Sequence, residues 1–126
     1  MNVRFLVTLA FASLGLAMPA FSMDRWEALS MIESGNNDRA IGAVGEVSRY
    51  QIRPEFWPGG NPQNPQVALT VAQKTMQSRL NQFVRRHQRQ PTDLEFYILW
   101  NAPWQADHPS AIVKERAQRF ANLVQS

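Results

Sequence analysis

The sequence contains no cysteine, which limits how its fold can be stabilised. None of the 126 residues can form a disulfide, so stability must come from packing even in an oxidising compartment. The excess of positive charge is also small, because the sequence has 13 lysines and arginines and 10 acidic residues, a formal net charge of +3. The one basic cluster, RRHQR at residues 85–89, falls near a predicted helix end, where cations interact favourably with the helix dipole. We therefore expect no nucleic-acid partner.

Long hydrophobic runs are confined to the N-terminus. Residues 1–4 give a short positive start, residues 5–18 are almost wholly apolar, and Ala20-Phe21-Ser22 fits a small-x-small cleavage site. The apolar run is shorter than the roughly 20 residues that span a bilayer comfortably. We interpret residues 1–22 as a secretory signal peptide, with a retained membrane anchor as the alternative. The mature chain, residues 23–126, is then expected to be exported to the periplasm or secreted, without stable membrane insertion.

The rest of the sequence predicts one mainly α-helical domain. A hydrophobic fraction of 44% and a charged fraction of 18% suit a single compact domain. Apolar residues at steps of three and four, together with capping residues, predict helices near residues 25–34, 65–90, 94–100 and 110–124. Thr92, followed three residues later by Glu95, predicts a capping box at the start of the third helix. The third contains FYILW, which is apolar nearly all round, and should be buried centrally.

The segment between the first two helices is rich in glycine and proline and is expected to be mostly loop. A single turn of helix is predicted over residues 53–57. A short extended piece is predicted over residues 46–52, the only strand signal that we find.

The first helix carries a carboxylate where it should end. Trp26, Leu29 and Glu33 fall on one stripe, and Gly35 supplies the stop. Carbonyls at a helix C-terminus disfavour negative charge by roughly 0.3–1 kcal/mol, and an apolar wall such as Trp100 would raise the carboxyl pKa further by desolvation. Glu33 is therefore a candidate general acid that stays protonated near neutral pH. The alternative is an ordinary solvated residue at a frayed helix end.

Residues 32–57, IESGNNDRAIGAVGEVSRYQIRPEFW, resemble the signature region of the lysozyme-like superfamily, in particular the soluble lytic transglycosylase and goose-type lysozyme group. Residues 96–103, FYILWNAP, are similar to an aromatic-Asn-Ala-Gly motif of that group, and RAQRF at residues 116–120 is similar to its terminal helix. Two departures are visible. Ser-Arg-Tyr-Gln at residues 48–51 stands where the group often has Gly-Leu-Met-Gln, and Pro103 stands where it has glycine.

The resemblance implies a lysozyme-like fold and a peptidoglycan lytic transglycosylase with Glu33 as its single catalytic acid and base. Such an enzyme cleaves the β-1,4 bond between N-acetylmuramic acid and N-acetylglucosamine, and the C6 hydroxyl of the muramic acid attacks to give a 1,6-anhydro product. Hydrolysis is the alternative outcome, with Glu46 as a possible second carboxylate and Asp38 as the next candidate. A non-catalytic peptidoglycan-binding or scaffold domain, and a small secreted interaction protein without a cleft, are further alternatives.

Five other residues are predicted to bind the glycan. Gln51 and Tyr50 would line the sugar groove, Trp100 and Asn101 would reach it from the buried helix, and Ser34 would orient Glu33 or the sugar. Each has a packing alternative, which for Ser34 is to satisfy the helix end.

Glu46 also has a structural alternative, in which it pairs with Arg49 or Arg53 to brace the loop. His87, His108 and Asp107 lack metal-ligand spacing, and no glycine-rich phosphate loop follows a strand. We therefore expect a monomer without metal or cofactor, whose partner is the peptidoglycan glycan strand.

Overall fold

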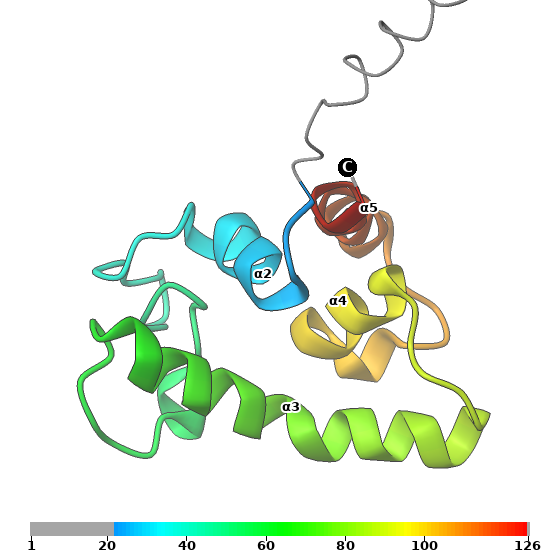
Figure 1. The fold of residues 1–126 in the computed structure, drawn as a ribbon, viewed down its shortest axis with the longest axis horizontal. Helices are drawn as coiled ribbons and strands as arrows, with labels where there is room; N and C mark the ends of the chain where they lie inside the picture. The colour runs from blue at the N-terminus through cyan, green and yellow to red at the C-terminus, as the bar shows by residue number, and fades with distance from the viewer. Residues whose placement is uncertain (1–21, 126) are drawn as a thin grey trace, which may run out of the picture.

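The computed structural model describes residues 22–125, which are mainly helical, as predicted (Figure 1). The α-helices in this range are α2 (Arg25–Ser34), α3 (Pro65–His87), α4 (Asp93–Asn101) and α5 (Ala111–Gln125), and the 3₁₀ helices are η1 (Pro54–Phe56) and η2 (Pro103–Gln105). Except for its last residue, the predicted signal peptide of residues 1–22 lies outside the described range. Within that range, no helix has both the length and the apolar character needed to cross a membrane.

Side-chain caps define where the helices begin. Asp24 accepts from the backbone N–H of Glu27 at the start of α2, and Asn64 accepts from two backbone N–H groups at the start of α3. The capping box predicted for α4 is confirmed, because the backbone N–H groups and side chains of Thr92 and Glu95 bond reciprocally. Helix α3 ends earlier than predicted, since Gln88 adopts a left-handed φ of 58°.

Helix α4 lies at the centre of the structure, as its apolar sequence predicts. Residues 96–99 are all buried, and α4 packs against both α5 and α3. The Phe96 ring stacks on Phe120 of α5 at 5.7 Å between centroids, and Trp26 of α2 meets the same ring edge-on at 5.4 Å. Burying each large apolar side chain contributes roughly 1.5–3 kcal/mol, so this aromatic contact fixes α2 and α5 relative to α4.

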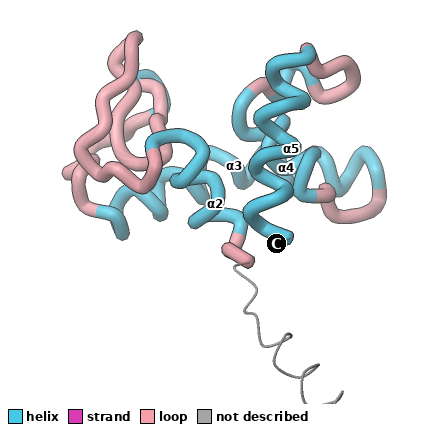
Figure 2. Tube along the Cα trace, turned by 90° about the horizontal axis from the view of Figure 1, so that it is seen from above, coloured by secondary structure: helices cyan, strands magenta, loops and turns pink. Residues whose placement is uncertain are grey.

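The long loop segment, residues 35–64, gathers at one end of the molecule, beside the end of α2 and the beginning of α3 (Figures 1 and 2). Tyr50 and Ile52 anchor it, because both side chains are buried in the common core. The Tyr50 ring meets Trp26 edge-on at 6.4 Å. The loop is therefore held against the last turns of α2, where Glu33 lies.

The prediction of an extended piece over residues 46–52 is wrong, because the chain reverses direction within this segment. Val47 forms isolated antiparallel bridges with Ile41 and with Ile52. The reversal uses positive φ angles at Ser48, 74°, and Gln51, 53°. Left-handed backbone at residues other than glycine gives little signal in a single sequence, which explains the difference.

Replacing Gly35 should show how strongly the end of α2 depends on left-handed backbone. Gly35 has a φ of 67°, and a Cβ there would meet no atom within 4 Å. The cost of Gly35→Ala is therefore conformational, about 1 kcal/mol. We expect a fall in Tm of about 4–8 °C by calorimetry. Gly35→Asn is the matched control and should lose less, because asparagine adopts this conformation more readily; equal losses would contradict the explanation.

Candidate active site

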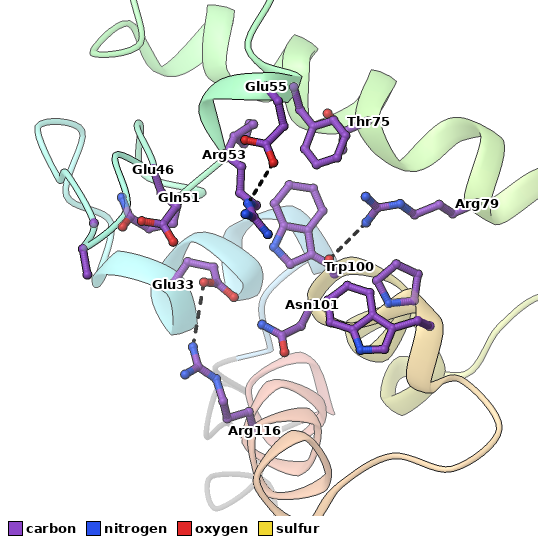
Figure 3. A pocket seen from close by; sticks show the side chains of 16 residues that line it. Glu33, Glu46, Gln51, Arg53, Glu55, Thr75, Arg79, Trp100, Asn101 and Arg116 are labelled. Carbon is purple, nitrogen blue, oxygen red and sulfur yellow. Dashed lines mark hydrogen bonds and ion pairs between the residues drawn. The ribbon is translucent and has the colours of Figure 1, made fainter.

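A cleft of about 620 Å³ opens between the loop segment and the helices (Figure 3). Its volume lies in the range of small-molecule and cofactor sites. The lining side chains come from the end of α2, the loop and η1, the middle of α3, the end of α4, η2 and α5: they are Glu33, Gly42, Ala43, Glu46, Gln51, Ile52, Arg53, Glu55, Phe56, Thr75, Arg79, Trp100, Asn101, Pro103, Trp104 and Arg116.

Glu33 lies in the last turn of α2 and lines this cleft. Only 10% of its side chain is exposed, so it is not a solvated residue at a frayed helix end. The helix end is also well defined, because the N–H of Gly35 bonds to the carbonyl of Met31 and the N–H of Asn36 to that of Ser30. The carboxyl group is therefore held in one place at the cleft wall.

Two residues from other helices contact the Glu33 carboxyl group. The hydroxyl of Tyr97 in α4 donates to Glu33 Oε2 at 2.9 Å, and Arg116 Nε in α5 donates to the same hydroxyl at 3.0 Å. Because an arginine can only donate, the Tyr97 oxygen accepts from Arg116 and its single hydrogen is donated to Glu33. Oε2 is thus an acceptor, and a neutral Glu33 carries its proton on Oε1.

Burial outweighs the stabilising contacts of the Glu33 carboxylate. Desolvation is the largest influence and raises the pKa of Glu33 above its ordinary value of 4.5. The Tyr97 hydrogen bond and the Arg116 charge oppose this, and the nearby Glu46 carboxylate adds to the increase. Arg116 Nη2 lies 3.8 Å from Glu33 Oε1, too far for a hydrogen bond. The net result is a carboxyl group that retains its proton more readily than a free glutamate.

Glu46 lies in the same cleft, on the loop above Glu33 (Figure 3). Its Oε1 accepts from the backbone N–H of Val44 at 3.0 Å. A Cβ on Gly42 would collide with the Glu46 and Gln51 side chains, so glycine at residue 42 allows both to pack against the backbone there. Glu46 is thus a positioned carboxylate that influences the charge of Glu33.

The ion pairs suggested for Glu46 are not formed. Arg49 pairs instead with Asp38, with Nε to Oδ1 at 2.7 Å, and Arg53 pairs with Glu55 at 3.2 Å. The Arg49 hydrogen bond is the largest influence on Asp38 and lowers its pKa. Asp38 therefore braces the loop and does not line the cleft, so it is not a candidate for the second carboxylate.

The structure divides the predicted glycan-binding residues into two groups. Gln51, Trp100 and Asn101 line the cleft with Glu33 and Glu46.

Ser34 and Tyr50 do not line the cleft. The Ser34 hydroxyl donates to the carbonyl of Arg49 at 2.8 Å and accepts from the backbone N–H of Asn37, so it joins the helix end to the loop. Tyr50 is only 4% exposed and packs in the core, because the reversal of the loop turns its ring toward Trp26. Their packing alternatives are the ones that the structure favours.

Four residues that contribute charge, hydrogen bonds or aromatic faces to the site are not among the predicted site residues. Tyr97 is fully buried and was assigned to the core with the rest of FYILW, although a buried hydroxyl group needs a partner and could have been singled out on that ground. Arg116 enters the sequence analysis only as part of RAQRF in the terminal helix, without a role in the site. No sequence pattern indicates Arg79 or Trp104, because the fold brings them to the cleft beside residues that are distant in sequence.

No group of three or more histidine, cysteine or acidic residues is placed to hold a metal ion within residues 22–125. Comparison of the chain with protein-family models, with curated proteins and with solved structures finds no match.

The raised pKa of Glu33 should make its contribution to stability fall as pH rises. Above about pH 4.5 the unfolded chain releases the Glu33 proton before the folded protein does, so the folded state is progressively disfavoured. Glu33→Gln has no proton to release at this position. We expect the Tm of the variant, relative to the wild type, to increase between pH 4 and pH 7.5. Glu27→Gln, on an exposed turn of the same helix, is the control, and parallel increases in both variants would contradict the assignment.

Removing the Tyr97 hydroxyl should raise the pKa of Glu33 further. The hydroxyl donates to the carboxylate and so favours its charged form. In Tyr97→Phe, a ¹³C NMR titration of the Glu33 carboxyl should show a midpoint at higher pH than in the wild type. Tyr50→Phe removes the other tyrosine hydroxyl, which does not contact Glu33, and should leave the midpoint in place. An unchanged midpoint in Tyr97→Phe would show that the hydrogen bond has no influence on the proton.

Proposed function

We propose that the chain is an exported peptidoglycan lytic transglycosylase with a lysozyme-like fold. The observation that carries the proposal is the position of Glu33, a carboxyl group 10% exposed with a raised pKa, on the wall of a cleft of about 620 Å³. A protonated carboxyl group in such a place is suited to donate to a glycosidic oxygen. The motif resemblance of residues 32–57 supplies the substrate class.

In the first step, Glu33 would donate its proton to the oxygen that links N-acetylmuramic acid to N-acetylglucosamine. The bond between this oxygen and the anomeric carbon breaks as the proton arrives. Tyr97 bonds to Oε2, which leaves Oε1 to carry the transferred proton. Arg116 then stabilises the carboxylate that remains, since its Nη2 lies 3.8 Å from Oε1.

In the second step, the Glu33 carboxylate would accept a proton from the C6 hydroxyl of the same muramic acid residue. The C6 oxygen bonds to the anomeric carbon, and the product is a 1,6-anhydro sugar. No water is consumed, and Glu33 ends the cycle protonated as it began. A single glutamate acting first as acid and then as base therefore suffices for this reaction.

The rest of the cleft supports a sugar ligand. Trp104, 75% exposed, and Trp100 offer aromatic faces on which sugar rings can stack, and both lie on the lining. Asn101 and Gln51 supply amide groups that can hydrogen-bond to N-acetyl and hydroxyl groups. Apolar faces combined with a few polar groups are typical of a site that binds a small organic ligand.

Hydrolysis by a lysozyme-type reaction is the second candidate, and the position of Glu46 favours it. Glu46 shares the cleft and raises the pKa of Glu33 by its charge, so the two carboxyl groups are close enough to interact. A second carboxylate could act as nucleophile or direct a water molecule to the anomeric carbon. Glu46→Gln should then abolish reducing-end products, whereas a transglycosylase should retain most of its rate.

Digestion of peptidoglycan sacculi with the wild type and with Glu33→Gln tests the proposal. The products are separated by liquid chromatography and identified by mass spectrometry. We expect anhydro-muropeptides from the wild type and a loss of about 10²–10⁴-fold in rate for the variant, the usual contribution of a general acid. Glu27→Gln, an exposed glutamate on the same helix, should retain wild-type activity.

The other outcomes are equally distinct. Reducing ends in place of anhydro ends identify the hydrolytic reaction. Binding of glycan strands without any product, unchanged in Glu33→Gln, identifies a binding or scaffold domain and overturns the enzymatic assignment. Absence of both turnover and glycan binding overturns the proposal altogether.

A further inference from the structure

One cation in the cleft has no acidic partner. Of the three arginines on the cleft lining, Arg53 pairs with Glu55 at 3.2 Å and Arg116 pairs with Glu33 at 3.8 Å. Arg79 forms no ion pair with any residue of the described range 22–125. Among the cleft arginines, it is therefore the one without an acidic side chain of residues 22–125 at ion-pair distance.

The Arg79 side chain is nevertheless held firmly. Its Nη1 donates to the carbonyl oxygens of Leu99 at 2.8 Å and Trp100 at 3.0 Å, which caps the last turn of α4. Its Cζ lies 5.9 Å from the centroid of the Phe56 ring, within range of a cation–π contact. Nε and Nη2 make no hydrogen bond to residues 22–125. A fixed guanidinium group thus keeps donors available for a planar acceptor such as a carboxylate.

The environment of Arg79 makes an anionic ligand favourable. The side chain is partly buried, and burial is the only influence on its pKa, which it lowers. No carboxylate compensates for the water that the group has lost, although a guanidinium stays charged in proteins. A partly desolvated charge without an acidic partner is costly, and a ligand carboxylate would reduce that cost.

Arg79 also lies apart from Glu33 and Glu46, and the third acidic residue of the cleft, Glu55, pairs with Arg53. Figure 3 shows it across the cleft from Glu46 and Gln51, reaching from α3 toward Trp100. Glu33 and Glu46 therefore lie on the side of the proposed reaction, and a cation without an acidic partner lies on the other side.

We infer that Arg79 forms a carboxylate-binding subsite, which makes the enzyme selective for anionic peptidoglycan glycans over neutral glycans of N-acetylglucosamine. The inference rests on the proposed function, since it concerns the same cleft. Two groups of the substrate can supply the carboxylate: the lactyl group of N-acetylmuramic acid when its peptide has been removed, and the peptide itself when it is present.

Binding of three glycans to the Glu33→Gln protein, which does not consume them, tests the subsite. The ligands are neutral tetra-N-acetylchitotetraose, a peptide-free peptidoglycan tetrasaccharide with lactyl carboxylates, and the same tetrasaccharide with its peptides, each measured by calorimetry. Adding Arg79→Gln should weaken an anionic glycan at least about tenfold more than the neutral one. Arg79→Lys, which keeps the charge but not the planar pair of donors, should give a smaller difference. Arg85→Gln, an exposed arginine on the same helix, should leave all three affinities unchanged.

The comparison of ligands separates a binding role from the capping role of Arg79. Loss of the α4 cap would weaken all three glycans by the same factor, and this result, like no change at all, overturns the inference. A selective loss for the peptide-free glycan assigns Arg79 to the lactyl carboxylate, and a selective loss for the peptide-bearing glycan assigns it to the peptide. If the parent protein binds none of the three, the proposed function itself fails. If it binds all three but Arg79→Gln shows no selectivity, only the subsite fails.

Discussion

The burial of one carboxyl group among three helices organises the whole site. Glu33 comes from α2, its hydrogen-bond donor Tyr97 from α4, and the arginine that orients that donor, Arg116, from α5. Removal of the carboxyl group from water is unfavourable for its charged form, and one hydrogen bond with one distant cation does not reverse that effect. The helices must therefore pack correctly before the group acquires its chemical properties. Stability and the proposed activity oppose each other here, because a raised pKa is a cost to the folded state above the ordinary pKa of glutamate.

The loop segment depends on the same helix end and completes the cleft. Ser34 joins the last turn of α2 to the carbonyl of Arg49, while the Arg49 side chain pairs with Asp38 on the other arm of the loop. Tyr50 fixes this assembly to the core through Trp26. Ser34, Asp38 and Tyr50 do not line the cleft, but they hold the loop that carries Glu46 and Gln51 in position. Two of the predicted glycan-binding positions belong to this supporting set, which gives them a physical reason to be polar or aromatic.

The sequence predicts what local patterns determine and misses what depends on distant contacts. The helix stop at Gly35, the capping box at Thr92 and the burial of residues 96–99 follow from short-range rules, and each is found as expected. The same rules led to Glu33. The position of Tyr50 depends on left-handed backbone at its neighbours Ser48 and Gln51, which a single sequence does not reveal.

The cleft arginines show the same limit. Arg116 and Arg79 contribute through their reach across helix interfaces, and the spacing of charged residues along a helix does not tell which of them faces a neighbouring segment. A hydroxyl within an otherwise apolar run is the one signal that could have drawn attention to the network, since a buried tyrosine oxygen needs a partner. Side-chain chemistry thus indicates that a contact is required, and the fold decides which residue provides it.

The absence of a side chain at Gly42 leaves room for two polar side chains of the cleft wall. A methyl group at this position would occupy the space of the Glu46 and Gln51 side-chain oxygens, and the backbone around it is closed by bonds from the Gly42 N–H to the Glu46 carbonyl and from the Gly45 N–H to the Gly42 carbonyl. A side chain at residue 42 would therefore require the ends of the Glu46 and Gln51 side chains to leave their present positions. Joint variation of residues 42, 46 and 51 across an alignment would mark lineages in which this wall of the cleft had been rebuilt.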